Sequence, residues 1–320
     1  MAVADRVLLL TDEGMDAHAT RGHPERPERL AAAVGGVEDG ARDAVAPLER
    51  GAARAASDDE IERIHPAWYV AALEDVADQG GGWIDPDTYV SDGSVEAARL
   101  AVGATIDAAR AAIRGEAAIA FAVVRPPGHH ALPERASGFC LLNNIAIAVA
   151  ALRAEDRVRR IAIVDWDVHH GDGTQAIFDA DPNLCYCSTH QSPLFPGTGA
   201  ADERGTGAAA GTKHNRPLPP GSGDDALLGA WEEDLLPAIA AFAPQALLVS
   251  AGYDAHEADP MANLGVTVDG YHRLGTAVGA LAHSLGLGSV ALTLEGGYDL
   301  AALRRSTAAS VEGLLAGLRG

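Results

Sequence analysis

Three side chains that can bind a metal lie at the end of one apolar run of the chain and just after it. The run Ile161–Asp165 ends on an aspartate, and Asp165, Asp167 and His169 occupy alternate positions. In an extended segment, alternate side chains point the same way, so Asp167 and His169 can approach one metal from a single loop. A third ligand must come from elsewhere, and Asp254, which follows another apolar run, is the best candidate. Each residue alone is more typical of a capping aspartate or a hydrogen-bonded core histidine, but the whole set favours a metal.

Two carboxylates and one imidazole leave a coordination position open for water and substrate, as a catalytic metal site requires. Zn²⁺ suits these ligands, and Fe²⁺ does so too. The tandem pair His129-His130 follows a stiff Pro-Pro-Gly turn. One imidazole could remove a proton from water at the metal while the other assists charge balance or protonation of the leaving group. Each needs an orienting carboxylate, and Asp165 and Asp172 are suitably placed near the metal strand.

Aromatic residues next to glycines could complete a binding site. Gly296-Gly297-Tyr298 places a phenol on a turn where glycine permits close approach to a ligand, and a phenol can stabilise an oxyanion. Gly138-Phe139 and Phe195 could line a narrow channel with two aromatic rings. The alternative for all three rings is simple packing in the core.

Alternating strands and helices must position these residues. Six apolar runs are predicted strands: Val7–Leu10, Ile119–Val124, Ile161–Asp165, Leu184–Ser188, Ala246–Ser250 and Ser289–Leu294. Five Ala/Leu-rich segments are predicted helices: Ser94–Arg114, Asn143–Arg153, Asp224–Ala241, Asp269–Leu285 and Leu300–Leu318. This pattern predicts an α/β fold with a parallel sheet, whose ligands bind beyond the carboxyl ends of the strands. We expect one domain over residues 1–320, with Gly197–Gly223 as a long surface loop near the site.

The composition narrows the classes of partner. The chain has 24 Lys+Arg against 45 Asp+Glu and a formal net charge of −21, which argues against nucleic-acid binding because phosphate needs clustered cations. The acidic surface, with Lys213 as the single lysine, favours salt adaptation (a halophilic protein) over attraction of a cationic partner.

No apolar run approaches the ~18–20 residues that a membrane span needs. The start of the chain does not resemble a signal peptide, and Cys140, Cys185 and Cys187 cannot all pair, so we expect a cytoplasmic protein with reduced thiols. An oligomer is compatible with the sequence.

Five motifs follow one another in order: Arg125–His130 (RPPGHH), Gly138–Asn144 (GFCLLNN), Asp165–Gly173 (DWDVHHGDG), Ser250–His256 (SAGYDAH) and Leu294–Tyr298 (LEGGY). In this order they resemble the histone deacetylase superfamily, which includes acetylpolyamine amidohydrolases and acetoin-utilisation proteins. The variants look closest to bacterial, archaeal and class II members. The resemblance extends from His23 to Tyr298. It implies an arginase/deacetylase α/β fold with a single central eight-stranded parallel sheet flanked by helices.

The resemblance also implies roles for individual residues. It implies a zinc site with two aspartates and one histidine as ligands, Asp167, His169 and Asp254. His130, paired with Asp172, is the implied general base, and His129, paired with Asp165, is its electrostatic partner. Tyr298 would hold the substrate carbonyl.

Further positions match the family's channel and ion sites. The implied walls of the acyl-lysine channel are Gly138, Phe139 and Phe195. The implied structural K⁺ site uses Asp165 and Ser188 with the backbone carbonyls of Asp167, His169 and Thr189. Arg29 matches an arginine near an internal cavity beneath the metal, and Asp87 aligns with a rim aspartate that grips the substrate backbone.

Met261 bears on the choice of substrate. It lies seven residues after Asp254. At this position, polyamine-specific members of the family carry a glutamate that recognises a distant ammonium group of the substrate. The sequence therefore predicts a zinc-dependent hydrolase that removes acetyl or other acyl groups from lysine side chains or related amines. The alternatives are an acetylpolyamine or other small-molecule amidohydrolase, a dimetal ureohydrolase on the same fold, and a non-catalytic acyl-lysine binder.

Overall fold

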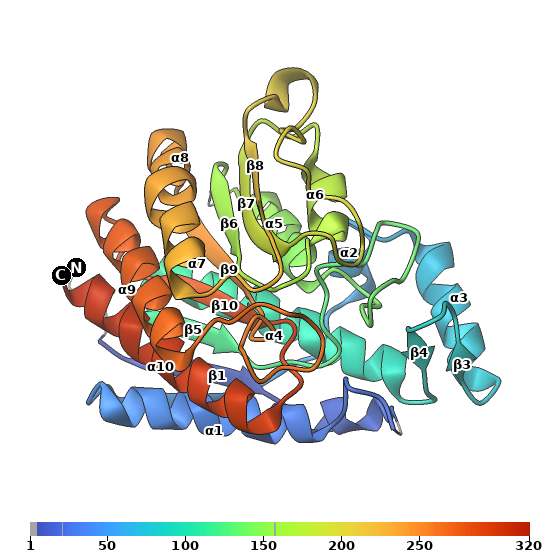
Figure 1. Ribbon diagram of the computed structural model, residues 1–320. Coiled ribbons are helices and arrows are strands. Elements are labelled where there is room, and N and C mark those ends of the chain that lie inside the picture. The colour runs from blue at the N-terminus through green and yellow to red at the C-terminus, as the bar shows by residue number, and fades with distance from the viewer. Residues whose placement is uncertain (1–4, 21, 157) are drawn as a thin grey trace.

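The centre of the molecule is a sheet of eight strands that all pair in parallel. The computed structural model describes residues 5–20, 22–156 and 158–320. In spatial order the strands are β2 (Leu48–Ala52), β1 (Val7–Thr11), β5 (Ile119–Ala122), β10 (Val290–Leu294), β9 (Ala246–Ala251), β6 (Ile161–Asp165), β7 (Leu184–Gln191) and β8 (Lys213–Leu218). Helices flank this sheet (Figure 1), which confirms the predicted fold class.

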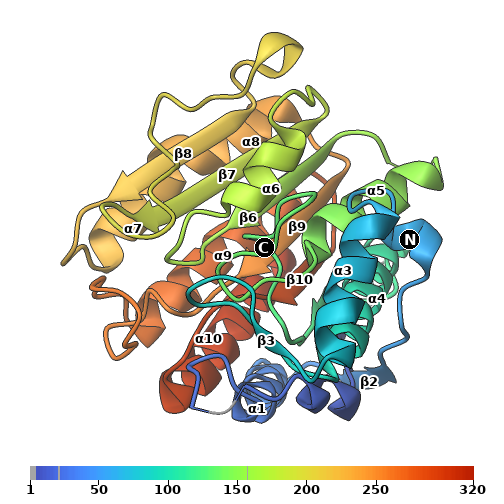
Figure 2. The same ribbon diagram turned by 90° about the vertical axis from the view of Figure 1, so that its right-hand side faces the viewer.

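The helices form two layers, one on each face of the sheet (Figures 1 and 2). One layer contains α1 (Glu28–Asp43), α7 (Asp224–Ala230), α8 (Leu236–Phe242), α9 (Val268–Ser284) and α10 (Leu300–Arg319). The other contains α2 (Asp58–Ile61), α3 (Ala67–Asp78), α4 (Ser94–Arg114), α5 (Asn144–Ala154) and α6 (Asp172–Phe178). A short antiparallel hairpin, β3 (Gly82–Trp83) and β4 (Tyr89–Val90), connects α3 to α4.

The register of the central strands brings the predicted functional segments together. Every residue of β5, β6, β9 and β10 is buried, as expected for a parallel sheet covered on both faces. Asp165 of β6 pairs with Ser188 of β7 on one side and with Ser250 of β9 on the other. Leu294 of β10 pairs with Ala251 of β9. The turns after β6, β7, β9 and β10 therefore leave the sheet at the same edge, where ligands of such folds bind.

The two outermost strands lie outside the six that the sequence predicts. The predicted loop Gly197–Gly223 contains β8, so that prediction is wrong for Lys213–Leu218. The strand has no apolar run because it lies at an edge of the sheet, and it carries Pro217, which edge strands tolerate. At the opposite edge, β2 is at least partly exposed along its whole length and is similarly weak in sequence signal.

The helix predictions are confirmed in position, with one difference in form. The predicted helix Asp224–Ala241 consists of α7, a π-helical turn at Trp231–Leu235, and α8. The sequence pattern does not predict helices α1, α2, α3 and α6. No helix in the described part of the chain is both long and apolar enough to cross a membrane. The thiols of Cys185 and Cys187 are buried and unpaired, with their sulfurs 3.8 Å apart, as predicted for a reduced pair.

Candidate metal centre and active site

Three buried side chains converge beyond the carboxyl ends of β6 and β9. One ligand atom from each of Asp167, His169 and Asp254 lies within 4.8 Å of the others, and these three form the one such group among the described residues. The turn after β6 is fixed by its own hydrogen bonds: the His169 amide donates to Asp167 Oδ1 at 2.9 Å, and the Val168 amide donates to Asp254 Oδ1 at 2.9 Å. The structure thus brings together the three metal ligands that the sequence predicts.

The donor set fits a divalent cation. Asp254 Oδ2 is buried and accepts no hydrogen bond from the described residues, although it lies 3.2 Å from His169 Nδ1. Burial, followed by the charge of Asp167, raises the pKa of Asp254. Burial alone would lower the pKa of His169, but the two carboxylates raise it to about 10. The site therefore has a strong negative field, which a bound divalent cation would neutralise.

Glycines allow the two carboxylates to converge. A Cβ atom on Gly252 would lie 2.1 Å from Asp167 Oδ2, and a Cβ atom on Gly296 would lie 2.0 Å from Asp254 Oδ2. Any other residue at either position would displace a carboxylate from the cluster. The amide of Gly296 also donates to Asp167 Oδ2 at 2.8 Å, so the LEGGY turn helps to orient a ligand. These two glycines explain part of the SAGYDAH and LEGGY motifs.

Each histidine of the tandem pair contacts the carboxylate that the sequence predicts for it. His129 Nδ1 lies 3.1 Å from Asp165 Oδ2, and His130 Nδ1 lies 2.7 Å from Asp172 Oδ1. A carboxylate only accepts hydrogen bonds, so each Nδ1–H is the donor and each carboxylate fixes the orientation of its ring. The two imidazole rings lie side by side, with centroids 4.0 Å apart.

The two histidines differ in basicity. Burial opposes the charged form of His129, but the charges of Asp167 and Asp165 outweigh it and raise the pKa of His129 well above its usual value. Burial, followed by the charge of His129, lowers the pKa of His130 to about 3. The pKa values of the two imidazoles are thus shifted in opposite directions, and the lowered pKa favours the neutral form of His130, which is the form that can accept a proton.

Glu295 supports the RPPGHH turn, a role that the sequence did not reveal. Its Oε2 accepts hydrogen bonds from the amides of Gly128 at 2.7 Å and His129 at 3.1 Å, and its Oε1 accepts one from Ser250 at 2.9 Å. The carboxyl group is fully buried, and burial raises its pKa to about 7. A glutamate directly after the apolar strand β10 is the one signal that could have pointed to this buried anchor.

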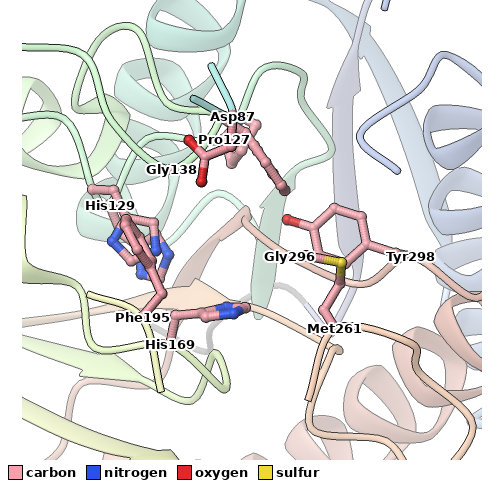
Figure 3. A pocket seen from close by; sticks show the side chains of 11 residues that line it. Asp87, Pro127, His129, Gly138, His169, Phe195, Met261, Gly296 and Tyr298 are labelled. Atoms are coloured by element: carbon pink, nitrogen blue, oxygen red, sulfur yellow. The ribbon is translucent and has the colours of Figure 1, made fainter. Parts of the chain in front are cut away.

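A narrow pocket of about 60 Å³ leads to the metal cluster. Its walls include all five residues predicted to contact substrate together with both tandem histidines and Tyr298: Asp87, Pro127, His129, His130, Gly138, Phe139, His169, Phe195, Met261, Gly296 and Tyr298. Figure 3 shows the Tyr298 hydroxyl pointing into the space between the Met261 side and the His129–His169 side. The Phe195 ring lies 5.0 Å from the His130 ring, and the Phe139 ring lies 5.7 Å from the Tyr298 ring.

Arg29 is buried behind the wall that carries Tyr298. Its Nε donates to the carbonyl of Gly297 at 2.6 Å, and its guanidinium carbon lies 4.7 Å from the centre of the Tyr298 ring. Glu25, which the sequence did not single out, joins Arg29 to the RPPGHH segment: it contacts Arg29 at 3.0 Å and Arg125 at 2.5 Å. Arg29 thus supports the turn before Tyr298, while the internal cavity expected near it stays a prediction.

The residues expected to hold K⁺ lie around the end of β6. Asp165 Oδ2 accepts a hydrogen bond from the Tyr186 hydroxyl at 2.9 Å, and Asp165 is in register with Ser188. The hydroxyl of Thr189 accepts a hydrogen bond from Trp231 Nε1 at 3.0 Å. With the carbonyls of Asp167 and His169, this set stays a predicted potassium site.

Comparison with known proteins gives a consistent assignment. The histone deacetylase domain matches residues 23–314. The chain is 43% identical over 279 residues to a probable deacetylase of Archaeoglobus fulgidus, covering 87% of this chain and 77% of that protein. It is 39% identical over 287 residues to a histone deacetylase-like amidohydrolase of Pseudomonas aeruginosa, covering 88% and 74%. The crystal structure of the HDA15 HD domain superposes with a TM-score of 0.90 at 36% identity, covering 98% of this chain and 88% of that one. The chain therefore belongs to the histone deacetylase family of hydrolases, whose named members here are deacetylases and amidohydrolases.

Proposed function

We propose that the protein is a zinc-dependent deacetylase that removes acetyl or other acyl groups from lysine side chains or related amines. One observation carries the proposal: His169, which clusters with Asp167 and Asp254, lines one narrow pocket together with Tyr298 and with His130, which Asp172 orients. Asp167, His169 and Asp254 would hold the metal. Zn²⁺ is the ion proposed, and Fe²⁺ is the alternative that suits the same ligands.

The chain's own residues divide the reaction between them. A bound divalent cation would polarise the acyl carbonyl and lower the pKa of water. His130, oriented by Asp172, takes a proton from the attacking water. The Tyr298 hydroxyl donates a hydrogen bond to the oxygen on which negative charge develops. The protonated His130 imidazole then gives its proton to the departing amine, while His129, paired with Asp165, balances charge beside it.

The pocket supports acyl-lysine as the substrate. The pocket is lined by the Phe139 and Phe195 rings, and a narrow channel with two aromatic walls suits an unbranched alkyl chain. Met261 contributes an apolar wall, so a distant ammonium finds no carboxylate at this position. Asp87 lies at the pocket, where it could bind the backbone of a peptide substrate. Acetylated polyamines and other small acylated amines are the alternative substrates.

Two other activities receive less support. A dimetal ureohydrolase needs a second group of ligands, and the described residues hold one group of three, beside which His129 and His130 are already paired with carboxylates. A non-catalytic binder of acyl-lysine would not need a neutral imidazole oriented by a carboxylate.

To test the proposal, metal-free protein is reloaded with Zn²⁺ or Fe²⁺ and its turnover is measured at low and high salt. The substrates are acetyl-lysine peptides, longer acyl-lysines and acetylated polyamines. We expect highest turnover on acyl-lysine peptides. Tyr298→Phe and His130→Ala should each reduce turnover by roughly 10²-fold or more. Near-normal turnover in both variants would refute the assignment. Measurements with K⁺ replaced by Na⁺ test the proposed potassium site by the shift in unfolding temperature.

A further inference from the structure

One carboxylate, on Asp259, connects two walls of the pocket. Asp259 lies in the segment after β9, five residues beyond Asp254, and is 6% exposed. Its Oδ2 accepts hydrogen bonds from the amides of Tyr298 at 2.6 Å and Asp299 at 3.1 Å. Its Oδ1 accepts one from the amide of Met261 at 3.1 Å. All three donors are backbone groups, so the carboxylate fixes the course of the chain at both walls.

The peptide unit between Gly297 and Tyr298 is held at both ends. Arg29 donates to its carbonyl at 2.6 Å, and Asp259 accepts from its amide at 2.6 Å. Gly297 has a φ of 120°, a conformation that favours glycine, so the backbone before Tyr298 has little steric restraint of its own. After Tyr298, Asp299 caps α10 by accepting a hydrogen bond from the Ala302 amide at 2.8 Å. The orientation of the phenol thus depends on two buried charged side chains and a helix cap.

Other charged residues near Tyr298 do not replace Asp259. Glu25 contacts Arg29 and Arg125 rather than the LEGGY turn, and Glu295 is bonded to the RPPGHH turn. In the described part of the chain, Asp259 is therefore the carboxylate that holds the Tyr298 amide.

We propose that Asp259 is a positioning residue that holds the Tyr298 hydroxyl at the substrate carbonyl and sets the Met261 wall at the same time. The inference rests on the proposed function, because it requires Tyr298 to act on the substrate. It explains why a buried carboxylate lies between two loops that contribute side chains to one pocket. It also predicts that the two walls can be separated by substitution, since each carboxylate oxygen serves a different wall.

A double-mutant cycle tests whether Asp259 acts through Tyr298. Asp259→Ala in the zinc-loaded enzyme should reduce kcat for an acetyl-lysine peptide by roughly 10–100-fold, since misplacement of a reacting group by about 1 Å has an effect of this size. In the Tyr298→Phe background, the same substitution should reduce kcat by less than about threefold, because the hydroxyl that Asp259 positions is already missing. Equal fold losses in the two backgrounds would overturn the proposal.

Asp259→Asn tests the two walls independently, and it replaces the alanine variant if that variant does not fold. Its amide oxygen can still accept from Tyr298 and Asp299, while its NH₂ group cannot accept from Met261. We expect kcat to stay within about threefold of the wild type and KM to rise for substrates that contact the Met261 wall. Unchanged kcat and KM would contradict the proposal.

Asp224 provides a matched control, since it accepts hydrogen bonds from the amide and hydroxyl of Thr267 at 2.8 and 2.7 Å and does not line the pocket. Asp224→Asn should leave kcat and KM unchanged. Turnover by the wild-type enzyme in the same assay tests the proposed function separately. An inactive wild type would count against that function, whereas an active wild type with an additive cycle would count only against Asp259.

Discussion

The inner end of the pocket and its mouth are built on different kinds of structure. The inner end, here called the floor, consists of Asp167, His169, Asp254 and the tandem histidines, all of which are buried. The first three lie in the turns that follow β6 and β9. The turn that carries the tandem histidines is hydrogen-bonded to Glu295, which directly follows β10. The mouth, here called the rim, consists of Asp87, Phe139, Phe195 and Met261, which lie on longer loops and on the segment between β3 and β4.

The difference in exposure between floor and rim indicates a division of labour. Asp167 and Asp254 are 1% exposed, whereas Phe195 is 41% exposed and Trp83, on the β3 strand beside the Asp87 loop, is 59% exposed. The sheet holds the floor rigidly, and loops generally vary more than the elements they connect. We therefore expect floor substitutions to reduce turnover of every substrate and rim substitutions to change which substrate is preferred.

The largest effect is expected from removing a metal ligand. Asp254→Asn should reduce turnover of all substrates to background, because the neutral amide weakens the negative site that a divalent cation needs. Metal content per chain, measured after dialysis, should fall in parallel. Asp225→Asn changes an exposed aspartate and should leave both unchanged. Full metal content with normal turnover in Asp254→Asn would contradict the placement of the floor.

A smaller loss is expected from removing the group that orients the general base. Asp172→Asn keeps the size of the side chain but removes the charge that lies 2.7 Å from His130 Nδ1. We expect kcat to fall by roughly 10–100-fold for every substrate, the usual effect of losing an orienting partner. Steady-state kinetics on a peptide and on a small acylated amine would check this. A fall in kcat for only one of the two substrates would contradict the proposed difference between floor and rim.

Rim substitutions should alter substrate preference. Phe195→Ala removes part of one channel wall and should raise KM roughly fivefold, which corresponds to about 1 kcal/mol of lost apolar contact. Met261→Glu places a carboxylate at the opposite wall and should shift the ratio of kcat/KM toward acetylated polyamines by roughly tenfold. Competition between the two substrates in one reaction measures this ratio directly. Equal losses on both substrates would show that Met261 does not discriminate.

The smallest effect on turnover is expected at His65, which supports the rim loop and whose contribution is measured in stability instead. His65 Nδ1 donates to the carbonyl of Pro133 at 2.9 Å, and its Nε2 accepts from the Asn143 amide at 2.9 Å, so the ring is neutral in the folded state. Burial lowers its pKa to about 4 from 6.5. The unfolded chain therefore binds a proton first as the pH falls, and stability is lost between about pH 6.5 and pH 4, by up to ~3 kcal/mol.

His65→Gln should flatten this part of the pH dependence of the unfolding free energy, measured by denaturant titration. The turnover of the variant at pH 8 should match that of the wild type. If the unfolding free energy of the variant falls between pH 6.5 and pH 4 as steeply as that of the wild type, His65 is not the group that titrates in this range.

The floor and the two carboxylates that orient its histidines were readable from the sequence, while three other supporting carboxylates were not. Asp167, His169 and Asp254 follow apolar strands, so the chemistry of the residues and the geometry of a parallel sheet together predicted their cluster. The three other supports are carboxylates whose partners are distant in sequence. Glu295 and Asp259 bind backbone amides, and Glu25 binds Arg125. No local pattern encodes such pairings, because they depend on how the loops pack.

The same contrast holds for the sheet. The central strands β5, β6, β9 and β10 are continuous apolar runs because both of their faces are buried. The edge strands β2 and β8 contain charged residues and were not predicted. Edge strands need no continuous apolar run, so the signal that identifies the centre of a parallel sheet is missing at its margins.

Metal titration tests the central claim most directly. The protein is stripped of metal, Zn²⁺ is added in steps, and turnover of an acetyl-lysine peptide is followed with metal content per chain. The account predicts no turnover without metal, a linear rise to a plateau at one Zn²⁺ per chain, and no plateau activity in Asp254→Asn. Full turnover by the stripped protein, or a plateau that requires two metals per chain, would contradict a single catalytic metal held by Asp167, His169 and Asp254.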